Sequence, residues 1–149
     1  MFQRQGGVAS PKIKYRQLSH TADLGLRIRG GSLEELFENA AAALSSVLTD
    51  RRTIRGRETR DLELEAPDRE ALLVDWLNRL LYLFDTEGFL GREFRVVFPS
   101  PERLQAQARG ESFDPSRHPE KTAVKAATYH HLEIRRMDEG WQATVILDL

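Results

Sequence analysis

The sequence contains no cysteine, and this absence excludes several kinds of site at once. Disulfide bonds, thiolate zinc sites and cysteine nucleophiles all require a thiol, so none of them can contribute to this fold or its chemistry. The sequence also lacks any apolar run that approaches the roughly 20 residues needed to cross a bilayer. Because no long apolar stretch follows the first charged residues either, we expect a cytoplasmic protein without membrane contact.

A strong excess of charge of either sign is also missing. The 22 Lys and Arg residues and the 23 Asp and Glu residues leave a formal net charge of -1. This balance argues against the wholesale neutralisation of phosphates that drives non-specific binding to nucleic acids. We therefore expect any RNA contact to be local, or to occur only through a partner.

The length of 149 residues is typical of one domain with one core. Residues 1–11 contain glycine, serine and proline and little that is apolar, so we interpret them as a flexible N-terminal extension. The domain itself is then expected to span residues 12–149.

Two segments have the periodicity of amphipathic helices. Ser32 followed by Glu35 has the pattern of a capping box, and an apolar stripe runs from there to about Thr49. Pro67 and Asp68 begin a second predicted helix, which ends at Gly88. We expect the apolar faces of both helices to form the core, whose centre should include Phe37, Leu44, Trp76, Leu80 and Phe84.

Alternating apolar and polar residues predict β-strands around these helices. The predicted strands cover residues 13–18, 24–28, 62–65, 94–98, 104–108, 122–136 and 141–147. In the strand 122–136 the even positions carry the apolar residues, so His130 is expected to point inward as a core residue. Strands grouped around two main helices, with a C-terminal β-hairpin, favour a single-domain α+β fold with an antiparallel or mixed β-sheet.

Three polar features remain outside this core. Residues 51–60 are half arginine, and we interpret them as a solvated loop. Residues 109–121 contain two prolines and are predicted to form a long loop of the kind that is often functional or mobile. The second helix carries a narrow polar strip that we interpret as solvent-facing, made of Asp75, Asn78, Tyr82 and Asp85.

Few residues suggest a catalytic, phosphate-binding or metal-binding site. There is no Gly-x-Ser-x-Gly elbow, and Gly30-Gly31 lacks the length and the lysine of a phosphate-binding loop. Asp23 follows His20 at a bend between two predicted strands, where it could bind a metal or simply cap the turn by accepting backbone amides. Asp148 is the penultimate residue, and an isolated acid there is usually just solvated. From these residues alone both alternatives stay open.

Five stretches, in the same order, resemble the archease family. They cover nearly the whole chain and read HTADLGLRIRG, SLEELFENAAAAL, LLVDWLNRLLYLFDTEGF, FDPSRHPEKTAVKAATYHHLEI and WQATVILDL. The resemblance implies an accessory protein that activates an RtcB-type RNA ligase, promoting its guanylylation and multiple turnover in tRNA splicing and RNA repair. It also implies that the chain is not an enzyme and meets RNA only indirectly, through the ligase.

The same resemblance implies a metal site. Its ligands would be Asp23, Asp148 and Leu149, the last through its main chain or terminal carboxylate, with His20 in a supporting role. An all-oxygen set favours calcium as the cofactor, with magnesium or manganese as alternatives, over zinc or copper. Bringing these anionic groups together would cause repulsion, which a divalent cation removes.

Two other functions are alternatives to the role of a ligase activator. A stand-alone metal-dependent hydrolase or nuclease could use Asp23 and Asp148, but it needs an open coordination position and a placed base. A general chaperone or RNA-binding module needs an exposed apolar patch or a basic stripe with aromatic residues. The sequence does not identify the physiological metal, the oligomeric state or the surface that contacts the ligase.

Overall fold

The computed structural model describes residues 9–19 and 23–149. Along the chain its elements are β1 (Tyr15–Ser19), β2 (Asp23–Gly30), α1 (Leu33–Leu48), the short 3-10 helix η1 (Arg51–Thr53), β3 (Glu58–Glu65), α2 (Arg69–Glu87), β4 (Phe89–Ser100), β5 (Arg103–Ser112), β6 (Ala126–Met137) and β7 (Gly140–Asp148). None of the helices in these described ranges is long and apolar enough to span a membrane.

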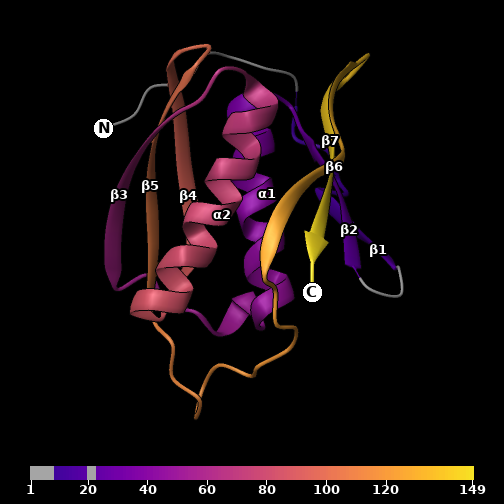
Figure 1. Cartoon of the computed structure of the whole chain (residues 1–149). Coiled ribbons are helices and arrows are strands. Elements are labelled where there is room, and N and C mark those ends of the chain that lie inside the picture. The colour runs from indigo at the N-terminus through magenta and orange to yellow at the C-terminus, as the bar shows by residue number, and fades with distance from the viewer. Residues whose placement is uncertain (1–8, 20–22) are drawn as a thin grey trace.

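The strands form two separate sheets with the two helices between them (Figure 1). One sheet has the order β1-β2-β7-β6 and the other β3-β5-β4, and every strand pairing in them is antiparallel. Both α1 and α2 contact both sheets, so the helices supply the middle layer. The predicted α+β class, the two main helices and the C-terminal hairpin are confirmed, although the strands divide into two sheets.

Both helices begin and end where their capping residues predict. The Ser32 hydroxyl accepts a hydrogen bond from the Glu35 amide at 3.1 Å, which satisfies a free donor of the first turn of α1. The Glu35 carboxylate accepts from the Gly31 amide at 2.9 Å, one residue before the cap. Asp68 caps α2 through the Ala71 amide, and Gly88 ends it in the left-handed conformation with φ 69°.

The core lies where the two helices meet the sheets. Trp76 is fully buried, and its indole N–H donates a hydrogen bond to the Phe37 carbonyl at 2.9 Å. Leu44 and Leu80 are also buried, whereas Phe84 is only partly buried and packs against the margin of the core. The predicted core is confirmed, and the indole hydrogen bond joins α2 directly to α1.

The prediction that His130 is a core residue is wrong, because the histidine side chain is exposed. The pairing of β6 with β7 changes register between Thr128 and Glu133, and His131 within this interval has φ 53°. Such a bulge breaks the alternation of faces along a strand. Before the bulge the odd-numbered Ala127 is buried, and after it the even-numbered Leu132 and Ile134 pack against the core. One pattern of alternation therefore does not hold along the whole strand, and β6 itself begins only at Ala126.

The arginine-rich segment 51–60 is a solvated loop only in part, because it begins with η1 and ends within β3. Arg51 donates from Nε to the Arg92 carbonyl at 2.8 Å, which fixes η1 to β4. Arg60 lies within β3, where its guanidinium stacks 4.8 Å from the centre of the Phe89 ring and pairs with Glu87 at 3.1 Å. The prediction holds for Arg52, Arg55 and Arg57, which are exposed, and residues 54–57 form an irregular connection.

One member of the polar strip on α2 closes a sheet edge. The Asn78 side chain accepts a hydrogen bond from the Ala127 amide at 2.8 Å and donates one to the Ala127 carbonyl at 3.1 Å. Because β6 is the edge strand of its sheet, Asn78 takes the place of a missing neighbouring strand at this point. The interpretation of this residue as simply solvent-facing is therefore wrong.

Candidate metal centre

The first residue of β2 and the last residue of β7 meet at one end of the four-stranded sheet. The antiparallel register of these strands places Asp23 directly opposite Asp148. Directly opposed residues have Cβ atoms roughly 4.5–5.5 Å apart and project to the same face of the sheet. The structure therefore brings together the two aspartates that the sequence places at opposite ends of the domain.

This pair lies on the outer face of the sheet, away from the helices. Val145 and Leu147 of β7 are fully buried and face the core, and alternation along the strand turns Asp148 to the opposite side, where it is exposed. Asp23 is half-buried. An ion or a partner group can thus approach the pair from solvent.

The side chain of Asp23 has one oxygen with no partner among residues 9–19 and 23–149. This oxygen, Oδ1, is buried and accepts no hydrogen bond from them. A carboxylate that caps a turn accepts backbone amides, so this oxygen does not match that alternative. A buried, unsatisfied acceptor costs roughly 1–3 kcal/mol, and a bound cation would remove this cost. The orphaned oxygen therefore fits a metal ligand better than a turn cap.

The C-terminal residues are held firmly beside Asp23. Asp148 pairs with Ala126 of β6 on the side opposite β2, and its carbonyl accepts a hydrogen bond from the Lys125 amide at 2.8 Å. Leu149 is partly buried and packs against the core, which fixes the end of the chain next to the two aspartates. Carboxylate and terminal oxygens are the hard donors that calcium, magnesium and manganese prefer.

Two further points concern the predicted metal ligands: the position of His20 and the number of side chains in the set. His20 lies outside the described residues, so its supporting role stays a prediction. Among residues 9–19 and 23–149, no group of three or more His, Asp or Glu side chains is arranged to hold a metal ion. The predicted set contains only two such side chains, Asp23 and Asp148, with the third donor coming from the chain terminus.

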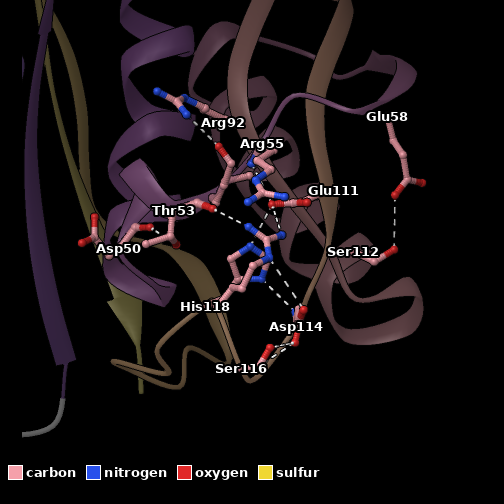
Figure 2. Close-up of polar contacts among 12 residues, drawn as sticks. Asp50, Thr53, Arg55, Glu58, Arg92, Glu111, Ser112, Asp114, Ser116 and His118 are labelled. Atoms are coloured by element: carbon pink, nitrogen blue, oxygen red, sulfur yellow. Dashed lines mark hydrogen bonds and ion pairs between the residues drawn. The ribbon is translucent and has the colours of Figure 1, made fainter.

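A second polar cluster, missed by the sequence analysis, is buried at the end of β5 (Figure 2). Glu111 is only 4% exposed, and its Oε2 accepts hydrogen bonds from Arg117 at 2.6 Å and from the Arg55 amide at 2.7 Å. His118 Nε2 lies 2.9 Å from the same oxygen. The Asp114 amide donates to His118 Nδ1 at 2.8 Å, so the imidazole carries its proton on Nε2 and donates to Glu111.

This network keeps Glu111 ionised. Burial alone raises the pKa of a carboxyl group, but hydrogen bonds from Arg117, the Arg55 amide and His118 outweigh it and lower the pKa of Glu111 to about 2. Three donors converge on one oxygen and tie the segment after η1 and the loop after β5 to the sheet. We interpret the cluster as structural, because its members satisfy one another.

No local pattern in the sequence identifies this cluster. Glu111 and His118 lie in a polar segment with two prolines, which is typical of a surface loop. One of the donors to Glu111 is the backbone amide of Arg55, which lies in a distant part of the sequence. Only the assembled fold shows that these residues belong together.

Comparison with known proteins places the chain in a family. The profile of the Archease protein family (MTH1598/TM1083) matches residues 15–149. The archease of Methanosarcina barkeri is 44% identical over 146 residues, which cover 95% of this chain and 100% of that protein. The archease of Pyrococcus abyssi is 39% identical over 140 residues, covering 91% and 99% respectively.

Solved structures agree with the sequence relatives. The solution structure of protein 1598 from Methanobacterium thermoautotrophicum superimposes with a TM-score of 0.78 at 38% identity, covering 91% of this chain and 98% of that one. The crystal structure of a Thermotoga maritima protein, described as an archease and possible chaperone, gives a TM-score of 0.62 at 24% identity. It covers 90% of this chain and 96% of that one, and it supports the fold alone. By its match to the family profile and by these relatives, the chain belongs to the Archease protein family.

Proposed function

We propose that this protein is a metal-binding accessory factor that activates an RtcB-type RNA ligase and performs no chemistry of its own. The observation that supports the proposal best is the pairing of Asp23 with Asp148, together with the buried Asp23 Oδ1, which accepts no hydrogen bond from the part of the chain that the structure describes. Family membership supplies the context, since the resemblance of this chain to the archeases implies the ligase partner.

In this proposal the metal is held by the two aspartate side chains and by the terminal residue Leu149. Calcium suits the donor set best, and magnesium or manganese fit the same hard oxygens. When bound, the cation neutralises the facing carboxylates and offers a positive centre to oxygen ligands of the partner. Asp23 and Asp148 present the ion at the edge of the molecule, and the Lys125 amide holds the Asp148 backbone in place.

The guanylylation and ligation steps belong to the partner. The ligase binds the RNA ends that react, and the cytoplasm is the expected compartment. We place the docking surface at the metal end of the four-stranded sheet, where the Asp148 side chain is exposed.

The rival chaperone function rests on the description of the Thermotoga maritima relative as a possible chaperone. A chaperone needs a contiguous exposed apolar patch. The large apolar side chains exposed in the described residues are Ile13 before β1, Tyr82 on α2, and Tyr129 and Met137 near the two ends of β6, so they are spread over three parts of the fold. The rival hydrolase function would require RNA or nucleotide turnover by the isolated protein.

The test is multiple-turnover ligation by the cognate ligase, at limiting enzyme, with and without this protein. Asp23→Ala and Asp148→Ala should remain folded and lose both metal binding and stimulation of ligase guanylylation. Asp138→Ala is the matched control, since it removes an exposed carboxylate at the opposite end of the β6–β7 hairpin. Full stimulation by either site variant would exclude the metal site from the activating surface. RNA processing by this protein alone would identify it as an enzyme.

A further inference from the structure

The outer face of the four-stranded sheet carries a group of arginines that the proposed function does not use. Leu26 and Ile28 of β2 are fully buried against the helices, so the alternate residues Arg27 and Arg29 project outward, where both are exposed. On the neighbouring strand β1, Arg16 is exposed and lies directly opposite Arg27. Three guanidinium groups therefore share one face.

These arginines surround a common hollow. Arg16, Arg27 and Arg29, together with Ile13, line a surface depression of about 70 Å³. Within the described residues none of the three forms an ion pair, and their one side-chain hydrogen bond runs from Arg29 Nε to the Gln142 amide oxygen at 3.1 Å. The hollow thus presents guanidinium donors that the protein's own carboxylates do not occupy.

This arrangement differs from that of several other arginines in the described residues. Arg60 and Arg117 each pair with carboxylates, and Arg52 pairs with Asp50. The opposed Arg16 and Arg27 instead form a like-charge pair across adjacent strands, which is unfavourable in the free protein. A bound anion would remove this repulsion.

The ligand chemistry follows from the donor geometry. A guanidinium presents a planar fork of N–H donors that matches the oxygens of a phosphate, and it keeps its charge at all relevant pH values. Arg27 and Arg29 are two residues apart along β2, which places their Cα atoms roughly 6.8 Å apart. This spacing is comparable with that of consecutive phosphates along an extended nucleic-acid strand.

Further hydrogen-bond donors lie on the strands and the segment next to these arginines. The register sets Arg29 opposite Gln142 of β7, and Gln142 opposite Arg135 of β6, whose guanidinium pairs with Glu133 at 3.0 Å. Lys14, whose carbonyl accepts a hydrogen bond from the Arg29 amide, is exposed beside the same row. An array of this extent suits a chain of phosphates better than a single phosphate group. We infer that the outer face of the four-stranded sheet, centred on Arg16, Arg27 and Arg29, binds the phosphodiester backbone of single-stranded RNA.

The positive charge of this surface is confined to one face of one sheet, which agrees with a net charge of -1 for the whole chain. It also lies on the same face as the aspartate pair, since Arg27 follows Asp23 by four residues on β2, roughly 13 Å along the strand. If the proposed function holds, RNA on the arginine face would run toward the end of the sheet where the ligase docks. The RNA contact itself requires neither the ligase nor the metal.

The test measures binding of a fluorescently labelled single-stranded RNA to the isolated protein by anisotropy over a series of salt concentrations. The parent protein should bind in a salt-dependent way. The triple variant Arg16→Gln, Arg27→Gln, Arg29→Gln should bind at least roughly tenfold more weakly, and the slope of log affinity against log salt should fall by about 2. The corresponding lysine variant keeps the charge, so it should preserve the salt slope while losing part of the affinity.

The matched control is Arg95→Gln with Arg103→Gln, which removes two exposed arginines from the outer face of the other sheet. It should bind RNA as the parent does. The inference is overturned if the parent does not bind RNA, or if the control loses as much affinity as the triple variant. It is also overturned if a polyglutamate peptide competes as well as RNA, or if a nucleoside triphosphate binds and RNA does not. Circular dichroism of each variant verifies its fold, and none of these outcomes depends on ligase activity.

Discussion

Asp23 lies directly opposite Asp148 across the β2–β7 ladder, so two carboxylates face each other between neighbouring strands. Like charges in this position destabilise a sheet, and within the described residues the buried Asp23 Oδ1 adds an unsatisfied acceptor. A cation bound between them would offset both effects. Metal binding and the stability of the fold are therefore expected to be coupled.

The first prediction concerns Asp148→Asn, which removes one charge and keeps the shape of the side chain. Calcium at about 100 times its dissociation constant should stabilise the parent protein by about 2.7 kcal/mol. The variant should lose most of this stabilisation and yet be no less stable than the parent in chelator, because the facing charges no longer repel. Thermal unfolding with calcium and with chelator measures both effects. Asp138→Asn should retain the calcium response, and retention of that response by Asp148→Asn would contradict the metal assignment.

A second prediction concerns the end of the chain. Leu149 has no side-chain donor, so its contribution to the site must come from its main chain or terminal carboxylate. A short Gly-Ser extension after Leu149 moves the terminal charge away from the aspartates and should weaken calcium binding in calorimetric titration. The same extension at the N-terminus is the control and should have no effect. Equal affinity of both extended proteins would remove the terminal carboxylate from the ligand set.

A third prediction concerns Asn78, which hydrogen-bonds both the amide and the carbonyl of Ala127. Asn78→Ala leaves both backbone groups without their partner, so it should cost about 1–3 kcal/mol in urea unfolding. Asp85→Ala, on the same polar strip but exposed, should cost less than about 0.5 kcal/mol. Similar costs for the two variants would mean that water replaces the side chain of Asn78 at the sheet edge.

The features that could be predicted from the sequence are those with local causes. Ser32, Asp68 and Gly88 bound the two helices through contacts within a few residues, and the apolar stripes of Phe37 and Trp76 repeat at helical spacing. Short-range rules are sufficient for such features. The meeting of Asp23 with Asp148 is different, because it depends on the pairing of strands from opposite ends of the chain. Periodicity does not specify that pairing, and only the family resemblance pointed to it.

The features that could not be predicted depend on non-local contacts or on breaks in a repeat. His130 is exposed because a bulge in β6 reverses the alternation, and no residue before it signals the change. Asn78 and Glu111 are polar residues whose partners come from other elements of the fold. Polarity alone predicts exposure for both, and the fold instead supplies them with hydrogen bonds.

The last prediction concerns acid stability and follows from Glu111. Its pKa is lowered from 4.5 to about 2 in the folded protein, so the unfolded chain takes up the proton at higher pH than the folded one. The stability that this charge contributes is therefore fully present above about pH 4.5 and is lost as the pH falls toward about 2. Glu111→Gln removes the charge and should cost about 1.5–3 kcal/mol at neutral pH.

Urea unfolding of both proteins across this pH range measures the effect. The difference in unfolding free energy between the parent and Glu111→Gln should be largest at neutral pH and should shrink steadily below about pH 4.5, because the parent loses its charge there. Glu139→Gln makes the same change at an exposed position and should remain close to the parent throughout. A difference that stays constant from neutral pH down to about 2 would mean that Glu111 stabilises the fold by packing. In that case the hydrogen bonds from Arg117, Arg55 and His118 would not depend on its charge.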